Sequence, residues 1–306
     1  MNKTVSFTLF TYNHERYIKD SVISVLNQSY SPLEIIISDD CSTDKTFDII
    51  KTIIKEYSGP HKVILNRNEK NLGIGAHVTK VLYEIASGEY IVMLAGDDIS
   101  KKYHVEEAVS LLNQYNDVSL IDFSADFIDE NGSIIKRSAS SHQITKYTIN
   151  DYLVLNRVGS FSPGRIFKRS LIEFFEPISE DCPTEDFVLV LRSLLQGGFY
   201  RIDNSLVYYR KHYTSLSNFK IYSKLSHYNI IKQFERDIIH SLKNKLITKY
   251  IFDILIKRIS LDLKIKNIKY KNKYKLPTYM NQLFIKLSIK YLRFKYIISL
   301  PKNLKG

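Results

Sequence analysis

Short apolar runs alternate with helical patterns along the first 94 residues, and this alternation limits the chain to few folds. Runs typical of strands cover residues 4–10, 33–38, 62–65 and 90–94, and helical patterns cover residues 15–27, 43–57 and 74–86. Strands that alternate with helices form a parallel sheet with helices on both faces. The sequence therefore predicts an α/β protein whose ligand binds beyond the carboxyl ends of its strands.

Polar side chains follow each predicted strand, where such a ligand would lie. The segments are "TYNHE", "SDDCSTD", "NRNEKNLG" and "AGDD" in chain order. The first of them lacks the glycines of a dinucleotide-binding turn. Carboxylates do not bind phosphates directly, so these acids indicate a divalent cation between the protein and a phosphorylated ligand. Solvated helix caps are the alternative interpretation of Asp97 and Asp98.

The texture of the chain changes twice after this first half. A helix is expected from residue 101 to 115 and a strand at 118–123, with a hairpin-type turn at "DENGS". Residues 159–209 have the mixed pattern of an α+β region, and from Asn218 onward the sequence is rich in Ile, Leu, Tyr and Lys. We therefore divide the chain into a domain of residues 1–217, with halves 1–98 and 99–217, and a tail of residues 218–306.

The positive charge of the chain is confined to this tail. The chain carries +12 overall, but residues from Asn218 onward hold 21 Lys and Arg against 4 acids, which leaves the body at −5. A nucleic-acid partner is therefore not expected. The two cysteines, Cys41 and Cys182, have no pairing pattern, which suits a reducing cytoplasm. The sequence shows no signal peptide and no apolar run of roughly 18 residues, so we expect a cytoplasmic protein.

Six motifs in a fixed order resemble the inverting family 2 glycosyltransferases, which have the GT-A fold. The motifs are "FTYNHERYIKDSVISVLNQSY", "EIIISDDCSTDKT", "NLGIGA", "ASGEYIVMLAGDD", "TEDFVLVLR" and "YYRKHYTSLS". The resemblance covers roughly residues 5–217. It implies a mostly parallel central sheet flanked by helices, to which this chain adds a basic helical C-terminal extension. Residues 1–98 would then bind a nucleotide-sugar and residues 99–217 the acceptor.

The resemblance implies a nucleotide-sugar donor across the strand ends. Tyr12 would stack on the base, Asp40 would accept a hydrogen bond from it, and Asp39 would support that loop. A carboxylate that only accepts hydrogen bonds suits the ring N–H of uracil, so a UDP-sugar is expected, although a thymidine donor presents the same edge. A core aromatic is the alternative interpretation of Tyr12.

The acids of "AGDD" match the metal-binding motif of the family. The resemblance implies that Asp97 contacts the ribose and that Asp98 binds Mn²⁺ or Mg²⁺ between the two phosphates. His212 would lie near the metal or the diphosphate, and Arg210 is a second candidate for the diphosphate. A surface histidine is the alternative for His212. The "AG" before the acids departs from the pattern of many relatives, which carry another acid there.

The motif "TEDFVLVLR" resembles the acceptor-side motif of the family and implies that Asp186 is the general base, with Glu185 as the adjacent alternative. An inverting transfer needs a carboxylate that accepts the proton of the attacking hydroxyl. Acids also favour the first turn of a helix capped by Thr184, and this is the structural alternative. The QxxRW motif of processive relatives is absent, so one sugar per visit is expected.

Apolar stripes at helical spacing run through the basic tail. They consist of Ile231, Phe234, Ile238, Leu242 and Leu246, and of Leu287, Tyr291, Phe294 and Ile298. Basic amphipathic helices of this kind lie on anionic membrane surfaces, although the stripes could instead pack on the catalytic domain or on a second subunit.

The expected protein is a metal-dependent, non-processive transferase of the hexosyl type. It would add one sugar to a polyprenyl-diphosphate-linked oligosaccharide during O-antigen or capsule biosynthesis, as a peripheral protein on the inner face of the cell membrane. The alternative is a degenerate transferase domain whose basic tail binds membrane or nucleic acid. Nucleotidyl transfer would need a glycine-rich loop after the first strand, and "TYNHER" is not one.

Overall fold

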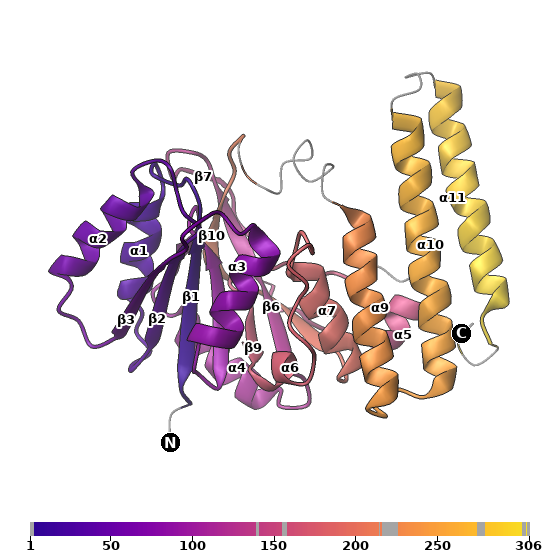
Figure 1. Cartoon of the computed structure of the whole chain (residues 1–306), viewed down its shortest axis with the longest axis horizontal. Coiled ribbons are helices and arrows are strands. Elements are labelled where there is room, and N and C mark those ends of the chain that lie inside the picture. Colours follow the sequence, from indigo (N-terminus) through magenta and orange to yellow (C-terminus); the bar gives the residue numbers. More distant parts are fainter. Residues whose placement is uncertain are drawn as a thin grey trace. The chain divides into compact units, whose positions relative to one another are not determined.

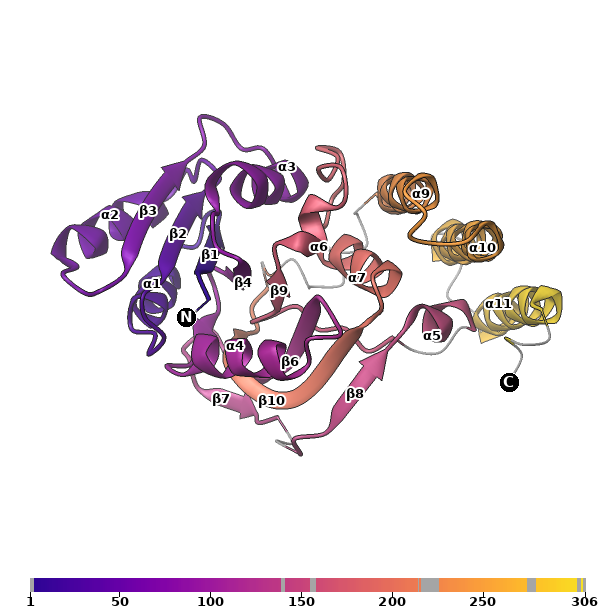
Figure 2. The same ribbon diagram turned by 90° about the horizontal axis from the view of Figure 1, so that it is seen from below.

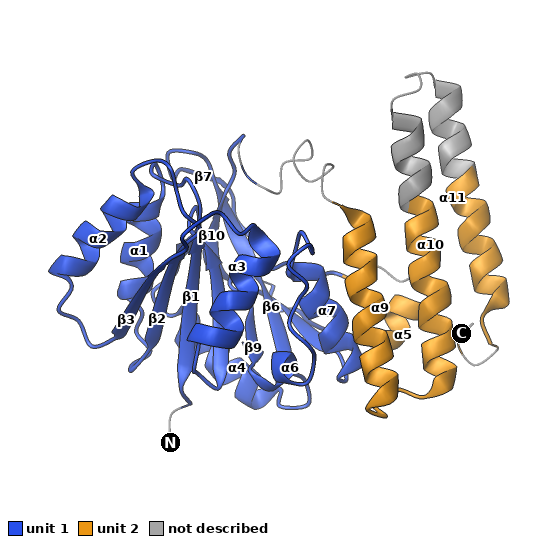
Figure 3. Ribbon diagram, in the orientation of Figure 1, with its two compact units in different colours: residues 1–147, 159–225 blue, residues 148–158, 226–306 orange. Residues whose placement is uncertain are grey.

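The chain folds into two compact units, which Figure 3 distinguishes by colour. The first comprises Met1–Tyr147 and Gly159–Leu225, and the second comprises Thr148–Val158 and Ser226–Gly306. The computed structural model describes residues 3–138, 141–154, 158–213, 215, 226–273, 279–301 and 304, with backbone alone for 266–273 and 279–287. The functional division at residues 98 and 217 stays a prediction.

The first half of unit 1 alternates strands and helices in the predicted order. Its elements are β1 (Val5–Thr11), α1 (Ile18–Leu26), β2 (Glu34–Asp39), α2 (Thr46–Glu56), β3 (Lys62–Arg67), α3 (Ile74–Lys80), the π-helical turn η1 (Val81–Ile85) and β4 (Tyr90–Ala95). The periodicity of the sequence placed the strands to within two residues of these bounds, because each strand is an apolar run that ends at polar residues.

The second half of unit 1 mixes short and long elements. They are β5 (Ile99–Ser100), α4 (His104–Gln114), β6 (Leu120–Ile128), β7 (Ile134–Lys136), β8 (Ile144–Tyr147), β9 (Ile166–Lys168), α6 (Ser170–Glu173), α7 (Asp186–Leu195) and β10 (Phe199–Arg210).

All strands of the unit join one sheet in the order β3-β2-β1-β4-β9-β6-β10-β5, with β7 beside β6 and β8 beside β10. The pairs among β1 to β4 are parallel, as is the pair of β6 with β10. The remaining pairs, including those of β9 with β4 and β6, are antiparallel. The sheet is therefore parallel in its first half and mixed as a whole (Figure 1).

Helices cover both faces of this sheet. Figure 2 shows α1, α2 and α4 along one face and α3, α6 and α7 along the other. The larger apolar core lies on the first face, where Val22, Ile50 and Leu112 pack against residues of the strands and are fully buried. A smaller cluster around Ile36 and Val81 lies on the second face.

The carboxyl ends of β1, β2 and β4 lie at one edge of the sheet. Thr11 pairs with Asp39 at the ends of β1 and β2. Backbone hydrogen bonds continue the ladder past the strands: the N–H of Asp40 donates to the carbonyl of Thr11 over 2.9 Å, and that of Gly96 to the carbonyl of Phe10 over 2.8 Å. The polar segments that follow these strands are thus brought together, as the sequence predicted.

A buried histidine anchors the loop before β9 to this edge. The Nε2 of His104 lies 2.8 Å from the carbonyl oxygen of Gly164, and its Nδ1 lies 2.8 Å from the Oγ of Ser100. Because a carbonyl only accepts, Nε2 carries the hydrogen and Nδ1 accepts from Ser100. Gly164 has a φ of +74°, and a Cβ there would lie 2.8 Å from Val207. Only glycine fits this approach without strain.

Burial of the His104 ring makes the stability of unit 1 depend on pH. Burial lowers the pKa of His104 to about 4, from an ordinary value of 6.5. Above pH 6.5 the ring is neutral in the folded and unfolded states, whereas below it the unfolded state takes up the proton first. We therefore expect the free energy of unfolding to fall as the pH drops from 6.5 toward 4, by about 3 kcal/mol for this residue.

Urea unfolding at a series of pH values measures this loss. His104→Gln should flatten the pH dependence, and the exposed His142→Gln should not. Three other histidines have a pKa lowered by burial and add to the loss in the same direction: His14, His61 and His77. A wild-type protein whose unfolding free energy stays constant across this range would contradict the expectation.

Unit 2 consists of helices and includes a short one from the middle of the chain. Its elements are α5 (Ile149–Leu153), α9 (His227–Lys243), α10 (Lys249–Lys273) and α11 (Tyr279–Ser299). The helical tail that the sequence predicted is therefore present. None of the helices in the described parts of the chain has the length and apolar composition that a membrane span requires.

Polar contacts join α5 to the two long helices of unit 2. The hydroxyl of Tyr152 donates to Asp262 on α10 over 2.9 Å, and Arg258 donates to the carbonyl of Tyr152 over 2.9 Å. Tyr296 on α11 donates to the carbonyl of Leu153 over 3.0 Å, and burial raises the pKa of Tyr296 to about 12. Residues 148–158 are thus part of the helical unit, which the sequence pattern did not predict.

Candidate active site

The loop after β1 is fixed against the loop after β2 by side-chain hydrogen bonds. The backbone N–H of Asn13 donates to the Oγ of Ser42 over 2.9 Å, and the side-chain oxygen of Asn13 accepts from the N–H of Thr43 over 2.8 Å. Asn13 itself has a φ of +54°, which asparagine tolerates better than most residues. This turn leaves the neighbouring Tyr12 side chain 41% exposed at the edge of the sheet, where a ring could stack on a flat ligand.

Asp39 maintains the turn that follows β2. Its carboxylate accepts from the N–H of Ser42 over 2.9 Å and also from the Ser42 hydroxyl, and it is fully buried. Arg67 at the end of β3 lies 3.5 Å from the same carboxylate. The structure therefore gives Asp39 the kind of loop contacts that a supporting residue makes.

Asp40 binds the segment between β3 and α3. Its carboxylate accepts from the side chain of Asn68 over 2.8 Å and from the N–H groups of Leu72 and Gly73 over 2.9 and 3.0 Å. A carboxylate accepts about four hydrogen bonds, so one acceptor position remains. The expected bond from a nucleobase to Asp40 stays a prediction.

Gly96 lets the loop after β4 approach the loop after β1. A Cβ at this position would lie 2.7 Å from the Oγ1 of Thr11 and 2.8 Å from the Nδ1 of His14, closer than any side-chain carbon can come. The small residue in "AGDD" is therefore required by packing. It brings Asp97, the first of the two acids that follow, close to His14.

Asp97, which lies close to His14, pairs with a second histidine, His212. The Nε2 of His212 lies 2.8 Å from the Oδ2 of Asp97, and both side chains are largely buried. Burial alone would raise the pKa of Asp97, but the hydrogen bond from His212 and the charges of His14 and His212 lower it below its ordinary value. The pair thus combines an anionic carboxylate and an imidazole at the end of β4.

Asp98 faces the interior instead. Its Oδ1 accepts from the backbone N–H of Arg210 over 2.9 Å, and its carbonyl accepts from the hydroxyl of Ser21. The side chain is almost fully buried, and burial together with the charge of Asp97 raises the pKa of Asp98 well above its ordinary value. The two adjacent carboxylates of the motif therefore have different surroundings.

The Arg210 guanidinium is buried and bonded to protein groups. It is 1% exposed and donates to the carbonyl of Asp97 over 2.9 Å and to those of Asp129 and Glu130 over 3.3 and 3.2 Å. Asp20 lies 3.4 Å away. The predicted contact of Arg210 with a diphosphate stays a prediction, and these bonds favour a role in joining loops.

The donor set at this edge is compatible with a divalent cation. Among the residues that the structure describes, no group of three or more His, Cys, Asp and Glu side chains converges on one point. Asp97 and His212 nevertheless provide an oxygen and a nitrogen 2.8 Å apart. Mg²⁺ sites commonly use one or two carboxylates and take further ligands from substrate phosphates, so such a pair fits a metal that arrives with its ligand.

Asp186 begins α7 and is held by the loop before β9. The Oγ of Ser162 donates to its Oδ2 over 2.9 Å. The Nη1 of Arg165 lies 3.2 Å from its carbonyl oxygen and 3.5 Å from its Oδ1. The carboxylate itself is 40% exposed, so it combines fixed orientation with access from solvent.

Arg165 is in turn fixed by a second, buried acid. Its Nε and Nη2 bind the two oxygens of Asp122 on β6 over 2.6 and 3.1 Å, and both side chains are almost fully buried. The N–H of Met93 on β4 donates to the carbonyl of Arg165 over 3.2 Å. Because β9 is antiparallel to β4, this loop, and with it Asp186, lies toward the carboxyl end of β4.

The surroundings of Glu185 change its pKa. Burial and the charge of Asp186 raise the pKa of Glu185 to about 8. Glu185 therefore carries a proton at neutral pH, and a protonated carboxylic acid cannot act as a base. Between the two acids that the sequence proposed for this role, the surroundings favour Asp186.

Several residues at this edge were not assigned a role from the sequence. His14 stood in the quoted "TYNHE", directly after a strand, and that position was a usable signal. Ser162, Arg165 and Asp122 gave no such signal, because the partners of the buried ion pair are 43 residues apart, one on β6 and the other in the loop before β9.

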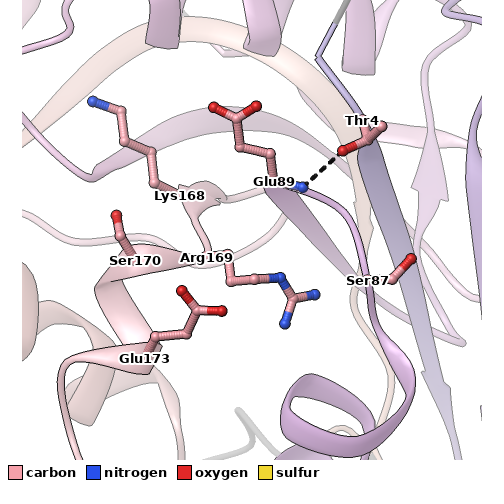
Figure 4. A pocket seen from close by; sticks show the side chains of 7 residues that line it. All are labelled: Thr4, Ser87, Glu89, Lys168, Arg169, Ser170 and Glu173. Atoms are coloured by element: carbon pink, nitrogen blue, oxygen red, sulfur yellow. Dashed lines mark hydrogen bonds between the residues drawn. The ribbon is translucent and has the colours of Figure 1, made fainter.

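A separate pocket lies at the opposite edge of the sheet (Figure 4). It measures about 370 Å³ and is lined by residues next to the amino ends of β1 and β4 and around the start of α6, among them Thr4, Glu89 and Lys168. It contains none of the predicted site residues, so the candidate active site is not this pocket.

Solved structures with the same fold are transferases of the GT-A class. TarS of Staphylococcus aureus in complex with UDP-GlcNAc matches 98% of this chain and 82% of its own, with a TM-score of 0.63 and 16% identity. The mannosyltransferase PcManGT of Pyrobaculum calidifontis in complex with GDP-Man and Mn²⁺ matches 97% and 87%, with a TM-score of 0.55 and 13% identity. The fold defined above is therefore a GT-A fold.

Sequence relatives identify the family. The profile of glycosyl transferase family 2 matches residues 6–175. An uncharacterized glycosyltransferase of Methanocaldococcus jannaschii is 30% identical over 213 residues, 67% of this chain and 70% of its own. TarS, a poly(ribitol-phosphate) beta-N-acetylglucosaminyltransferase, is 25% identical over 207 residues, 65% of this chain and 34% of its own. The chain belongs to glycosyl transferase family 2 and is a glycosyltransferase, as the motifs indicated.

Ser162→Ala tests whether the loop before β9 positions Asp186. Removing one hydrogen bond to a charged group should lower kcat about tenfold. The affinity for the donor should not change, because the hydrogen bonds that the structure shows for Ser162 join it to Asp186 and Arg165 and not to Tyr12, Asp40 or Asp97. Ser119→Ala is the matched control, since its hydroxyl bonds Gln196 and not Asp186. A loss of donor affinity or thermal stability equal to the loss of turnover would argue against a positioning role.

Proposed function

We propose that the protein transfers one sugar, with inversion, from a UDP-sugar to a hydroxyl of a polyprenyl-diphosphate-linked oligosaccharide. The reaction would serve the assembly of a surface polysaccharide at the cytoplasmic face of the membrane. The observation that carries this proposal is that two acids with different surroundings lie at one edge of the sheet. Asp97 is paired with an imidazole, and Asp186 is oriented and accessible.

Asp186 has the properties that the base of an inverting transfer requires. The acceptor hydroxyl gives its proton to the Asp186 carboxylate while its oxygen forms a bond to the anomeric carbon. The bond from that carbon to the diphosphate oxygen breaks, and both of its electrons leave with the nucleoside diphosphate. Ser162 and Arg165 hold the carboxylate in one orientation, which lowers the entropy cost of reaching the reactive geometry.

Asp97 and His212 are the residues that would hold Mn²⁺ or Mg²⁺. When bound there, the cation neutralises the charge that develops on the leaving diphosphate. This proposal differs from the expectation that Asp98 binds the metal, because Asp98 accepts a hydrogen bond from Arg210 within the protein interior. The Mn²⁺ in the PcManGT structure supports a metal in a protein of this fold.

The choice of a UDP-sugar rests on the two residues that are expected to contact the base. Tyr12 offers an exposed ring, and Asp40 has an acceptor position left that suits a ring N–H. The complex of TarS with UDP-GlcNAc supports the same choice. TarS is a poly(ribitol-phosphate) beta-N-acetylglucosaminyltransferase, and this supports an acceptor from cell-surface polysaccharide assembly.

A donor screen by saturation-transfer NMR tests this proposal. With Mn²⁺ present, we expect signals from the uracil and ribose protons of a UDP-sugar and weaker ones from dTDP- and GDP-sugars. Tyr12→Ala should reduce the uracil signal, because the base loses its stacking partner, worth roughly 1–3 kcal/mol. Tyr103→Ala, which removes an exposed ring elsewhere, is the control. Binding of a GDP-sugar alone would overturn the base assignment.

The two acids of "AGDD" should respond differently to alanine. Asp97→Ala should weaken Mn²⁺-dependent donor binding at least about tenfold. Removing a residue that only hydrogen-bonds to a metal ligand already lowers metal affinity about tenfold or more, and removing the ligand itself should cost at least as much. Asp98→Ala leaves the N–H of Arg210 without an acceptor, so it should lower the free energy of unfolding by about 1–3 kcal/mol. Titration calorimetry with Mn²⁺ or EDTA, together with urea unfolding, separates the two effects. Donor binding of Asp97→Ala that is as tight as in the wild type and still sensitive to EDTA would exclude Asp97 as a ligand.

A further inference from the structure

The described end of α11 has two apolar faces, one buried in unit 2 and the other exposed. Tyr296 and Leu300 are 6% and 4% exposed, and the Tyr296 hydroxyl bonds the carbonyl of Leu153 on α5. This face packs in the core of the helical unit. It accounts for the attachment of α11 to its neighbours.

The second face presents large apolar side chains to solvent. It consists of four residues, which we name the docking face: Tyr291, Phe294, Ile297 and Ile298, exposed by 63%, 62%, 39% and 55%. Their spacing places them on one side of the helix, away from Tyr296. A cluster of exposed aromatic and aliphatic side chains costs free energy in water and marks an interaction surface.

The charges around the docking face all have the same sign. Lys290, Arg293 and Lys295 lie in the same turns and are exposed, and α11 contains no Asp or Glu from Tyr279 to Ser299. By helical geometry Lys295 falls on one flank of the face and Arg293 on the other, and Lys290 lies one turn before Phe294 on the face itself. Long basic side chains can extend sideways toward anionic groups while the apolar residues between them are buried.

We propose that the docking face inserts at the surface of an anionic lipid bilayer. Apolar side chains enter the boundary between headgroups and acyl chains, and the flanking cations meet lipid phosphates. A second copy of the chain fits less well, because pairing two docking faces would bring six cations together without an acid on either helix. This inference goes beyond the proposed reaction and does not rest on it.

The two apolar stripes that the sequence indicated differ in their exposure to solvent. On α9, Ile231 and Ile238 are 9% and 0% exposed, so this stripe packs inside the protein. The side chain of Leu287 lies outside the described residues. The membrane-facing residues of the tail are therefore assigned to the last three turns of α11.

Sedimentation of the full-length protein with vesicles tests the proposal without any substrate. We expect binding to vesicles of phosphatidylcholine mixed with phosphatidylglycerol, and at least about tenfold weaker binding to phosphatidylcholine alone. The double variant Phe294→Ser/Ile298→Ser should bind the mixed vesicles about tenfold more weakly, because both side chains lose their burial in lipid. Ile239→Ser, which removes an exposed apolar residue from α9, is the matched control and should bind like the wild type.

Charge variants and light scattering complete the test. Lys290→Gln/Arg293→Gln/Lys295→Gln should remove the preference for phosphatidylglycerol and the sensitivity to salt. Equal binding of the serine variant and the wild type would overturn the proposal, and so would a wild type that stays in the supernatant. A wild type that is dimeric by light scattering, with a monomeric serine variant, would assign the face to a second copy. Because no donor is present, these outcomes are independent of the proposed function.

Discussion

The buried guanidinium of Arg210 connects the two halves of the catalytic unit. A cation in the protein interior is costly unless each of its donors finds an acceptor. Arg210 finds them in the carbonyl groups of Asp97, Asp129 and Glu130, and its backbone N–H holds the carboxylate of Asp98. The end of β10 is thereby fixed to the end of β4. The orientation of the two acids after β4 depends on this connection, because it holds Asp98 toward the interior while Asp97 pairs with His212.

The first half of the fold could be predicted from the sequence, because each of its strands is a continuous apolar run and each run ends at polar residues. The same rule confirmed the mostly parallel sheet but could not locate its short antiparallel strand. Strand β9 has only three residues, Ile166–Lys168, yet it pairs with both β4 and β6 and runs antiparallel to each of them. A segment this short has no periodicity that distinguishes it from a loop, and its position is determined by tertiary pairing.

The candidate site was predictable in its location but not in the roles of its members. Parallel strands bring their carboxyl ends to one edge, so Tyr12, Asp40 and Asp97 could be grouped without a structure. The different surroundings of Asp97 and Asp98 could not be predicted, because they depend on β10, more than a hundred residues later in the chain. The support of Asp186 by Arg165 was equally hidden, since a buried ion pair leaves no pattern in the sequence around either partner.

Residues 148–158 belong to the helical unit, and this affects the order in which the chain can fold during synthesis. Helix α5 is made before β9, α7 and β10, but its bonding partners come late. Tyr152 bonds Asp262, which follows it by 110 residues, and Leu153 bonds Tyr296, which follows it by 143. Domains usually fold as they emerge, starting from the N-terminus. The polypeptide passes between the two units three times. Nearly the whole chain must therefore be synthesised before α5 can form these hydrogen bonds, and the helical unit is completed last.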